Sequence, residues 1–233
     1  MCSICGILGG SGLESEKIIK EMNATMKNRG PDQSGIFRDG DIHLAHNRLA
    51  IIDVENGRQP MTRVYGGVSY TIVYNGEIYN TAELTEIIKS RGITPETYCD
   101  TEVVLWLYIL FGEGCAEMLN GIFAFAVFNG RTKEICLVRD RFGIKPLFYA
   151  FDGKTMIFAS EIKAILKYPS IKPIVDEKGI WQLIFLTPVR LSGGIFRNVS
   201  ELEPAHYGIW RDGTFKKRRY WELKAAVCTE SRD

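Results

Sequence analysis

Apolar positions along the chain recur with two different spacings, so both strands and helices are expected. The run at residues 3–8 is almost wholly apolar and ends at a Gly-Gly pair, which is typical of a short buried strand. The next segment has apolar residues four apart, on one helix face, from a capping Ser15 to a stop at Gly30-Pro31; these residues are Ile18, Met22 and Met26. The pattern therefore predicts a strand and then a helix.

The middle of the chain predicts two strands followed by two helices. Residues 42–48 alternate, with Ile42, Leu44, His46 and Arg48 on one side, and residues 68–74 are rich in β-branched and aromatic side chains. Residues 81–91 and 101–111 carry apolar positions at helical spacing. Each of these two segments is followed by a glycine suited to the end of a helix.

Short strands predominate after residue 120. They are predicted at 122–128, 134–138, 147–151 and 156–159, with turns at Asn129-Gly130 and Asp152-Gly153. Two further helices are predicted at 160–166 and 176–186, before a last hairpin over 207–221 that turns at Asp212-Gly213. Because runs of strands alternate with runs of helices, the pattern indicates an α+β fold with mainly antiparallel sheets.

Length and composition are typical of one large folded domain, or of one domain with an extension. The chain has 233 residues, and its 45% hydrophobic and 24% charged residues exclude disorder as the main state. We divide it into a domain at residues 1–190 and terminal strands at 191–223 that complete that domain. Residues 224–233 lack a pattern and resemble the start of a linker cut short.

Charge and hydropathy exclude several classes of partner. The 29 basic and 28 acidic residues leave a formal charge of +1, whereas a nucleic-acid-binding protein normally has a basic excess. No apolar run approaches the length needed to span a membrane, and the N-terminus lacks the basic start of a secretory signal. Six scattered cysteines are expected to remain thiols, so the predicted compartment is the cytoplasm.

Cys2 is the first candidate for chemistry, because it follows the initiator methionine. Methionine removal favours a small second residue, and a mature N-terminal cysteine combines a thiol with an α-amine whose reference pKa is about 7.7–8.0. Such an amine can take the thiol proton without a histidine, and none of the three histidines lies in a metal-binding or papain-like context. The alternative is an ordinary thiol near a frayed terminus.

Eight segments, in one order along the chain, decide between these alternatives. They are MCSICGILGG at 1–10, NRGPDQSG at 28–35, HNRLAIID at 46–53, YNGEIYN at 74–80, CDTEVVL at 99–105, LNGIFAFAVF at 119–128, RDRFGIKPLFY at 139–149 and ASEIKAIL at 159–166. With ELEPAHY at 201–207, they make the chain resemble the class II glutamine amidotransferases, which use an N-terminal nucleophile. The resemblance is strongest to the glutamine-hydrolysing domain of asparagine synthetase.

The resemblance implies a catalytic set of three residues. Cys2 would attack the side-chain amide of glutamine, release ammonia and form a γ-glutamyl thioester that water hydrolyses. The oxyanion would be held by the side-chain amide of Asn75 and the backbone N–H of Gly76, a position where a missing Cβ lets the backbone approach the substrate. Without this context, Asn75-Gly76 would be interpreted as a simple turn.

The resemblance also implies a substrate-binding set. Arg48 would grip the α-carboxylate of glutamine with two parallel hydrogen bonds, and Asp100 would take its α-ammonium group. Glu77 would contact the ammonium or orient its loop. The family's pocket is further lined by the backbone of Leu49, Ala50, Ile51 and Ile52.

Three other motifs are interpreted as lying outside the catalytic set. The pair Cys2 and Cys5 has redox or zinc spacing, but no second cysteine pair exists nearby, so no metal is predicted and Cys5 is expected to be buried. The Gly-Gly segment at 192–194 lacks the aspartate and serine of a pyrophosphate-binding loop. RGPD at 29–32 is predicted to fold near the nucleophile, and residues 139–149 to form a structural hairpin.

The implied fold is a four-layer αββα sandwich of two mostly antiparallel sheets, with Cys2 at the end of the first strand. The implied partners are L-glutamine and a synthetase domain absent from this chain, with a homodimer left open. No cofactor is expected in this chain, because ATP and Mg²⁺ belong to the missing domain. The alternatives are another class II amidotransferase, such as glucosamine-6-phosphate synthase or amidophosphoribosyltransferase, and a glutamine-binding regulatory module with little turnover.

Overall fold

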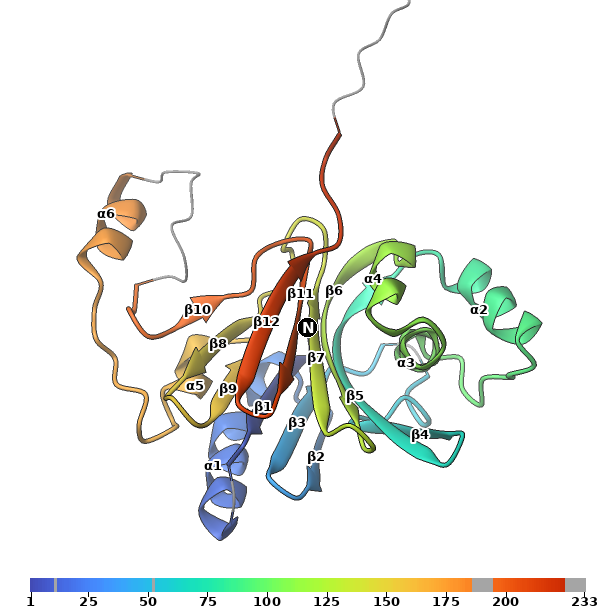
Figure 1. The fold of residues 1–233 in the computed structure, drawn as a ribbon, viewed down its shortest axis with the longest axis horizontal. Helices are drawn as coiled ribbons and strands as arrows, with labels where there is room; N and C mark the ends of the chain where they lie inside the picture. The colour runs from blue at the N-terminus through green and yellow to red at the C-terminus, as the bar shows by residue number, and fades with distance from the viewer. Residues whose placement is uncertain (11, 52, 186–194, 225–233) are drawn as a thin grey trace, which may run out of the picture.

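Two six-stranded antiparallel sheets face each other in the computed structural model, which describes residues 1–10, 12–51, 53–185 and 195–224 (Figure 1). The first sheet has the order β10-β8-β9-β1-β3-β2, with β1 (Ser3–Leu8), β2 (Gln33–Asp39), β3 (Ile42–Arg48), β8 (Phe148–Phe151), β9 (Met156–Ala159) and β10 (Ser200–Glu201). The second has the order β12-β11-β7-β6-β5-β4, with β4 (Met61–Tyr65), β5 (Val68–Ile78), β6 (Gly121–Asn129), β7 (Glu134–Arg139), β11 (His206–Arg211) and β12 (Thr214–Arg219).

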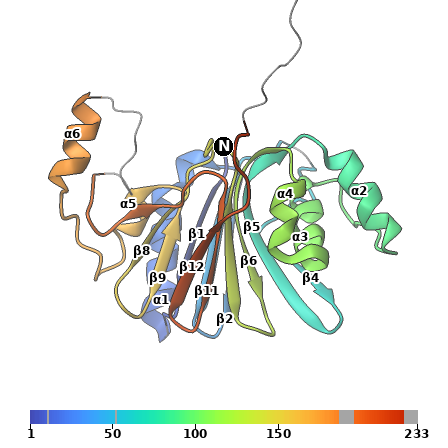
Figure 2. The same cartoon turned by 45° about the horizontal axis from the view of Figure 1, so that its top comes forward.

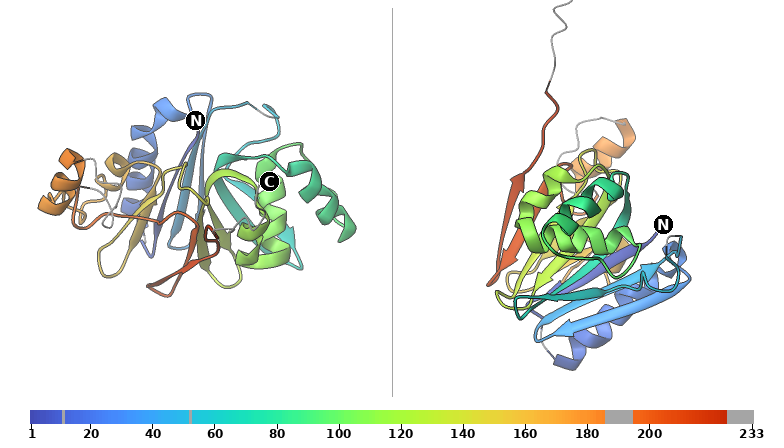
Figure 3. Two further views of the ribbon diagram at one scale, coloured as in Figure 1. Left: turned by 90° about the horizontal axis from the view of Figure 1, so that it is seen from above. Right: turned by 90° about the vertical axis from the view of Figure 1, so that its right-hand side faces the viewer.

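Helices cover the outer face of each sheet (Figure 3). The first sheet is covered by α1 (Gly12–Thr25) and α5 (Ile162–Ile165), and the second by α2 (Thr81–Ser90), α3 (Asp100–Phe111) and α4 (Cys115–Met118). The last helix, α6 (Glu177–Phe185), lies to one side of the sandwich, and two short 3-10 helices occupy Lys27–Arg29 and Gly112–Gly114. The predicted four-layer α+β sandwich is therefore confirmed.

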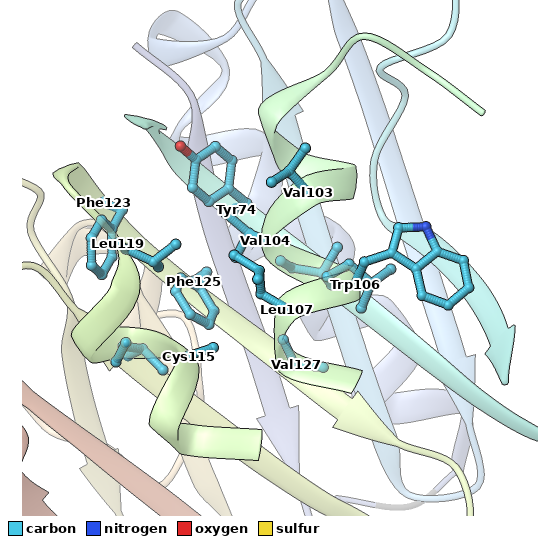
Figure 4. Packing of buried hydrophobic residues seen from close by; sticks show 14 of the residues in the cluster. Tyr74, Val103, Val104, Trp106, Leu107, Cys115, Leu119, Phe123, Phe125 and Val127 are labelled. Carbon is cyan, nitrogen blue, oxygen red and sulfur yellow. The ribbon is translucent and has the colours of Figure 1, made fainter. Parts of the chain in front are cut away.

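Alternation along the strands divides the core into three apolar layers. On β6, Phe123 and Phe125 pack against α3 and α4 (Figure 4). Ala124 and Ala126, at the alternate positions, face the other sheet. On β1, Ile4 faces the second sheet and Ile7 packs beneath α1. Strands buried on both faces explain why the segments at 3–8 and 122–128 are continuously apolar.

Two edge strands escaped the sequence analysis. β2 has alternating intermediate and exposed positions, and most residues of β4 are at least partly exposed, so neither segment has a strong apolar signal. β5 is also longer than predicted, because it runs on to Ile78. The NGE motif thus lies within a strand rather than in a loop or turn.

The prediction of a hairpin over residues 139–149 is wrong. This segment starts at the end of β7 in the second sheet and leads to β8 in the first, so it crosses between the two sheets. Asp140 shapes the crossing by accepting hydrogen bonds from the backbone N–H groups of Phe123, Phe142, Ile144 and Lys145. Two smaller corrections concern helices: α1 starts at Gly12, so Ser15 lies inside it, and α5 is only four residues long.

The terminal strands extend both sheets. β10 pairs with β8, and β11 pairs with β7, so the end of the described chain lies beside elements far earlier in sequence (Figure 2). The boundary predicted between residues 190 and 191 lies outside the described residues, as does the predicted linker beyond Lys224. Among the described helices, none has the length and apolar character needed to cross a membrane.

Candidate active site

Strand alternation aims Cys2 and Asn75 into the same gap between the sheets. Cys2 precedes β1 and shares the parity of Ile4, which faces the second sheet. Asn75 lies on β5 with the parity of Val73, which faces the first sheet. A cavity of about 120 Å³ opens here, lined by Met1, Cys2, Arg48, Leu49, Ile51, Gln59, Tyr74, Asn75, Gly76, Glu77, Cys99, Asp100, Thr101 and Lys145.

The Cys2 thiol is held by the backbone around it. The N–H of Leu49 donates to Cys2 Sγ at 3.4 Å, and Arg29 Nε donates to the Cys2 carbonyl oxygen at 3.1 Å. The second contact confirms that the RGPD segment folds near the nucleophile. Burial raises the pKa of the thiol, while the Leu49 hydrogen bond and nearby positive charges lower it less. The thiol is therefore neutral at neutral pH and needs a proton acceptor in order to react.

Asn75 lines this cavity and carries an unused side-chain donor. Its side chain is 1% exposed, yet Nδ2 finds no hydrogen-bond acceptor among the described residues. A buried amide without an acceptor loses about 1–3 kcal/mol, so such a group is uncommon unless a ligand completes it. Its position opposite Cys2 is where an oxyanion formed on a bound amide would need a donor.

Gly76 is required to be a glycine by the packing of the strand beside it. A Cβ at this position would lie 2.5 Å from the carbonyl oxygen of Ile122 on β6, so the neighbouring strand excludes a side chain. Strand packing alone is therefore sufficient to require a glycine at this position. Gly76 nonetheless lies in the wall of the cavity, directly after Asn75.

Asp100 is the first residue of α3 and lines the cavity. The Tyr74 hydroxyl donates to its Oδ2 at 2.7 Å, and the backbone N–H of Ile78 donates to the same oxygen at 3.3 Å. Burial raises the pKa of the Asp100 carboxyl, and these hydrogen bonds oppose the rise. The pKa of Tyr74 is raised well above 10 by burial and by the carboxylate, so the phenol stays neutral and remains the donor.

Arg48 is committed to the loop that follows it. Its Nη1 donates to Gln33 Oε1 at 3.0 Å and to the Val54 carbonyl at 2.9 Å, and its Nη2 donates to the Asp53 carbonyl at 2.7 Å. Gly57 closes over the guanidinium, because a Cβ there would lie 2.3 Å from Nη2. Arg48 lines the cavity, but the structure does not show its two-pronged face open toward a carboxylate.

Only some of the remaining predicted binding residues line the cavity. Leu49 and Ile51 line the cavity, as does Glu77, whose side chain is exposed. Ala50 lies outside the lining, where its N–H donates to Asp32 Oδ2 at 2.8 Å. Ile52 lies outside the described residues.

Several lining residues were missed by the sequence analysis; they are Met1, Gln59, Tyr74, Cys99, Thr101 and Lys145. Gln59 fixes two walls at once, because its Oε1 accepts from the Tyr74 N–H at 2.6 Å and its Nε2 donates to Thr101 Oγ1 at 3.2 Å. Tyr74, Cys99 and Thr101 lie inside motifs quoted above. Their neighbours carried the recognisable chemistry, which is why these three were passed over.

Cys5 lies away from this chemistry. It is fully buried on the opposite face of β1, beneath α1, as a free thiol. The Cys-x-x-Cys spacing therefore does not bring two thiols into one site. Within the described residues, no cluster of three or more histidine, cysteine or acidic side chains could hold a metal ion.

Comparisons with known proteins agree on one family. The sequence-family model of the glutamine amidotransferase domain matches residues 1–221 of this chain. Asparagine synthetase 3 (glutamine-hydrolysing) of Bacillus subtilis (strain 168) is 41% identical over 99% of this chain and 38% of its own length. A putative asparagine synthetase 2 (glutamine-hydrolysing) of Methanocaldococcus jannaschii is 36% identical over 96% of this chain and 47% of its own length. The chain thus spans less than half of these relatives.

Solved structures show the same fold at lower identity. The allosteric regulatory enzyme of purine biosynthesis superimposes with a TM-score of 0.72 at 21% identity, over 95% of this chain and 50% of its own. The glutamine phosphoribosylpyrophosphate amidotransferase of B. subtilis gives a TM-score of 0.71 at 20% identity, over the same shares of the two chains. With a family match that covers nearly the whole sequence, this chain belongs to the glutamine amidotransferase domain family.

Proposed function

We propose that this chain hydrolyses L-glutamine to glutamate and ammonia through a γ-glutamyl thioester on Cys2. The observation that carries the proposal is the pairing of Cys2 with the unsatisfied Nδ2 of Asn75 in one cavity. One group supplies a nucleophile and the other a buried donor, which are the two requirements of acyl transfer from an amide. Family membership and the relatives' names support the same substrate.

The reaction starts once Met1 is removed and Cys2 carries a free α-amine. The amine takes the thiol proton as Sγ attacks the side-chain carbonyl carbon of glutamine. The tetrahedral intermediate places its oxyanion toward Asn75 Nδ2 and the Gly76 N–H. Collapse of this intermediate breaks the C–N bond, and the amine returns the proton to the departing ammonia. Water then attacks the thioester by the same route and releases glutamate and the thiol.

Substrate specificity is assigned to the walls of the cavity. The Asp100 carboxylate, oriented by Tyr74, suits an α-ammonium group because both partners are desolvated. Arg48 supplies positive charge for the α-carboxylate. A direct contact requires that its guanidinium exchange one of its loop carbonyl acceptors for the substrate.

The proposal extends to the setting of the reaction. The relatives are named asparagine synthetases and are much longer, so we infer that the ammonia passes to an ATP-dependent synthetase domain outside this chain. Hydrolysis itself uses no cofactor in this scheme, because thiol, amine and amide suffice. A cytoplasmic location and a homodimer remain expectations from the sequence.

Glutamate release by the purified chain tests the proposal directly. Mass spectrometry first establishes that Met1 is absent, and glutamate is then measured against a Cys2→Ala variant with the same N-terminal processing. We expect turnover by the parent chain and none by the variant. Acid quenching should trap a γ-glutamyl adduct on Cys2 during turnover.

A binding module gives a different result. If the Met1-free chain bound glutamine in calorimetry but released no glutamate, the proposed hydrolysis by this chain would be wrong. Turnover that survived Cys2→Ala would equally reject the thioester route.

A further inference from the structure

Lys145 is a buried cation that the proposed reaction has not used. It lies in the crossing between β7 and β8, where its side chain is 6% exposed and lines the cavity beside Met1 and Cys2. Its backbone is fixed on both sides. The Lys145 N–H donates to Asp140 Oδ2 at 2.9 Å, and its carbonyl accepts from Arg139 Nε at 2.8 Å.

The Lys145 ammonium has an unusually weak partner. Its Nζ lies 3.4 Å from Met1 Sδ, and a thioether is a poor hydrogen-bond acceptor. Lysines this buried are normally paired with an anion. Across the part of the chain that the structure describes, no carboxylate forms an ion pair with Lys145. Its position is therefore poorly explained by stability alone.

Removal of Met1 changes what this ammonium faces. The thioether disappears, and the new α-amine of Cys2 takes the place of the peptide nitrogen that joined the two residues. The side chain, Cα and carbonyl carbon of Met1 join that nitrogen to the sulfur that Lys145 Nζ contacts. Met1 lines the reaction cavity and is 60% exposed, so the space that it vacates lies where the cavity meets solvent.

We propose that Lys145 is a positioning residue for the reaction, whose ammonium disfavours protonation of the mature Cys2 α-amine and so keeps that amine a proton acceptor. This inference rests on the function proposed above. It is electrostatic, because two positive charges in the same partly enclosed cavity repel each other more strongly than they would in bulk water. It also explains how the nucleophile is activated in a cavity with no histidine among its described lining residues.

The other charges around Cys2 fit this assignment. The Arg29 guanidinium donates to the Cys2 carbonyl oxygen and is paired with Glu161 at 3.3 Å. Arg48 lines the opposite wall and holds its own loop. The Asp100 carboxylate opposes these cations but is engaged by Tyr74, while Glu77 is exposed. Among these cations, Lys145 is the one that loses its hydrogen-bond partner, the Met1 thioether, when Met1 is removed.

The first test measures the amine without using activity. In a Cys2→Ala background, cyanate carbamylates the α-amine of residue 2 only when that amine is unprotonated, and the modified N-terminal peptide is quantified across pH. Lys145→Met, added to this background, keeps the side-chain length and removes the charge. It should raise the midpoint, the pH at which carbamylation is half-maximal, by about one unit, or about tenfold in the protonation equilibrium of the amine. Lys145→Arg should leave it unchanged.

Controls separate this effect from misfolding and from general charge. Lys27→Met removes a positive charge from an exposed site and should not move the midpoint. Thermal unfolding is compared first, and Lys145→Gln replaces Lys145→Met should the latter not fold. Equal midpoints with and without the Lys145 charge would overturn the inference, whatever the outcome of the glutaminase assay.

The second test uses glutamine turnover by the Met1-free chain. Lys145→Met should shift the acidic limb of the kcat profile to higher pH, because a more basic amine stays protonated longer, and Lys145→Arg should restore it. The KM for glutamine should change little. A loss confined to KM, with an unmoved acidic limb, would make Lys145 a substrate-binding residue and reject its action on the amine.

Discussion

The roles of Cys2 and Asn75 follow from strand alternation, which directs both side chains between the sheets, and from the effect of burial on each side chain. The thiol is protonated because the cavity disfavours its anion, whereas the amide is left with an unused N–H. A site arranged in this way is incomplete until a substrate supplies an oxygen acceptor. The contribution of the amide should therefore be large for turnover and small for folding.

Replacement of Asn75 tests this contribution. Asn75→Ala should lower kcat about 10²–10³-fold, the range typical of losing one oxyanion donor, with a small change in the KM for glutamine. Thermal stability should not fall, because the variant removes a donor that has no acceptor. Asn28→Ala, at an exposed position of the first 3-10 helix, serves as the matched control. A fall in kcat of less than threefold would contradict the assignment of Asn75 to the oxyanion.

A buried histidine fixes the strand that carries Asn75. His46 on β3 is fully buried, and its Nε2 lies 2.9 Å from the Tyr74 carbonyl oxygen on β5, so it links the two sheets next to Asn75. Burial lowers the pKa of His46 to about 3. The unfolded chain, with a histidine pKa of about 6.5, binds the proton more readily. Stability is thus complete above pH 6.5 and decreases as the pH falls toward 3.

Acid unfolding measures this linkage. Between pH 7 and pH 5 the His46 contribution should lower the free energy of unfolding by about 2 kcal/mol, as urea titrations at each pH would record. His46→Gln keeps an N–H donor but does not titrate, so its stability should depend less on pH in this interval. His206→Gln on β11 is the control. If His46→Gln retained the full pH dependence, another group would be responsible.

At the scale of elements, the pairing of β5 with β6 sets the position of the oxyanion donors. Asn75 and Gly76 lie opposite Ala124 and Phe123, and the partner strand β6 leaves no room for a side chain on Gly76. A methyl group here must push the strands apart or rotate the backbone that carries Asn75. The effect should reach both folding and turnover.

Alanine substitution at two glycines isolates this packing. Gly76→Ala should destabilise the fold by several kcal/mol, as overpacking of a close strand contact does, and abolish turnover. Gly114→Ala should be neutral or stabilising by up to about 1 kcal/mol, because a Cβ there meets no atom within 4 Å and the backbone φ is −60°. Chemical denaturation gives both values. Equal stability of the two variants would show that β6 does not constrain Gly76.

Some elements could be predicted from the sequence and others could not. β1 and β3 were predicted with the bounds that the structure shows, because each is continuously buried and each ends at a polar or glycine-rich turn. β2 and β4 were missed because edge strands need only one weakly apolar face. The 139–149 crossing was mistaken for a hairpin, because Gly143 and Pro146 signal a turn but not which sheet receives the next strand.

The candidate site shows the same limit. Motif resemblance supplied Cys2, Asn75 and Asp100, which the fold brings into one cavity. It did not supply Gln59 or Lys145, because their importance comes from contacts with residues distant in sequence. Gln59 contacts Tyr74, 15 positions away, and Lys145 contacts Met1, 144 positions away. It also did not show that Arg48 holds its own loop, since a motif carries no information about which acceptors a guanidinium meets.

At the scale of the whole molecule, the terminal strands are bound into both sheets through one buried arginine. Arg139 is 1% exposed, and it donates to the carbonyl oxygens of Leu202, Gly143 and Lys145 and to the Glu201 carboxylate at 2.7 Å. The Tyr220 hydroxyl donates back to the Arg139 carbonyl at 2.7 Å. Residues near 139 and residues 201–220 therefore depend on one another, although sequence separates them widely.

Truncation after Phe185 tests whether the first part of the chain folds alone. The shortened chain loses β10, β11 and β12, exposes the edge of β7 and leaves the Arg139 guanidinium buried without the Leu202 and Glu201 acceptors. Removing the carboxylate partner of a buried cation costs about 3–5 kcal/mol, a large part of the stability of a typical domain. We expect no cooperative unfolding transition and little near-ultraviolet circular dichroism, against a clear transition for the full chain. A sharp transition in the truncated chain, with glutaminase activity retained, would show that residues 1–185 form the domain and that β10–β12 are an attachment to it.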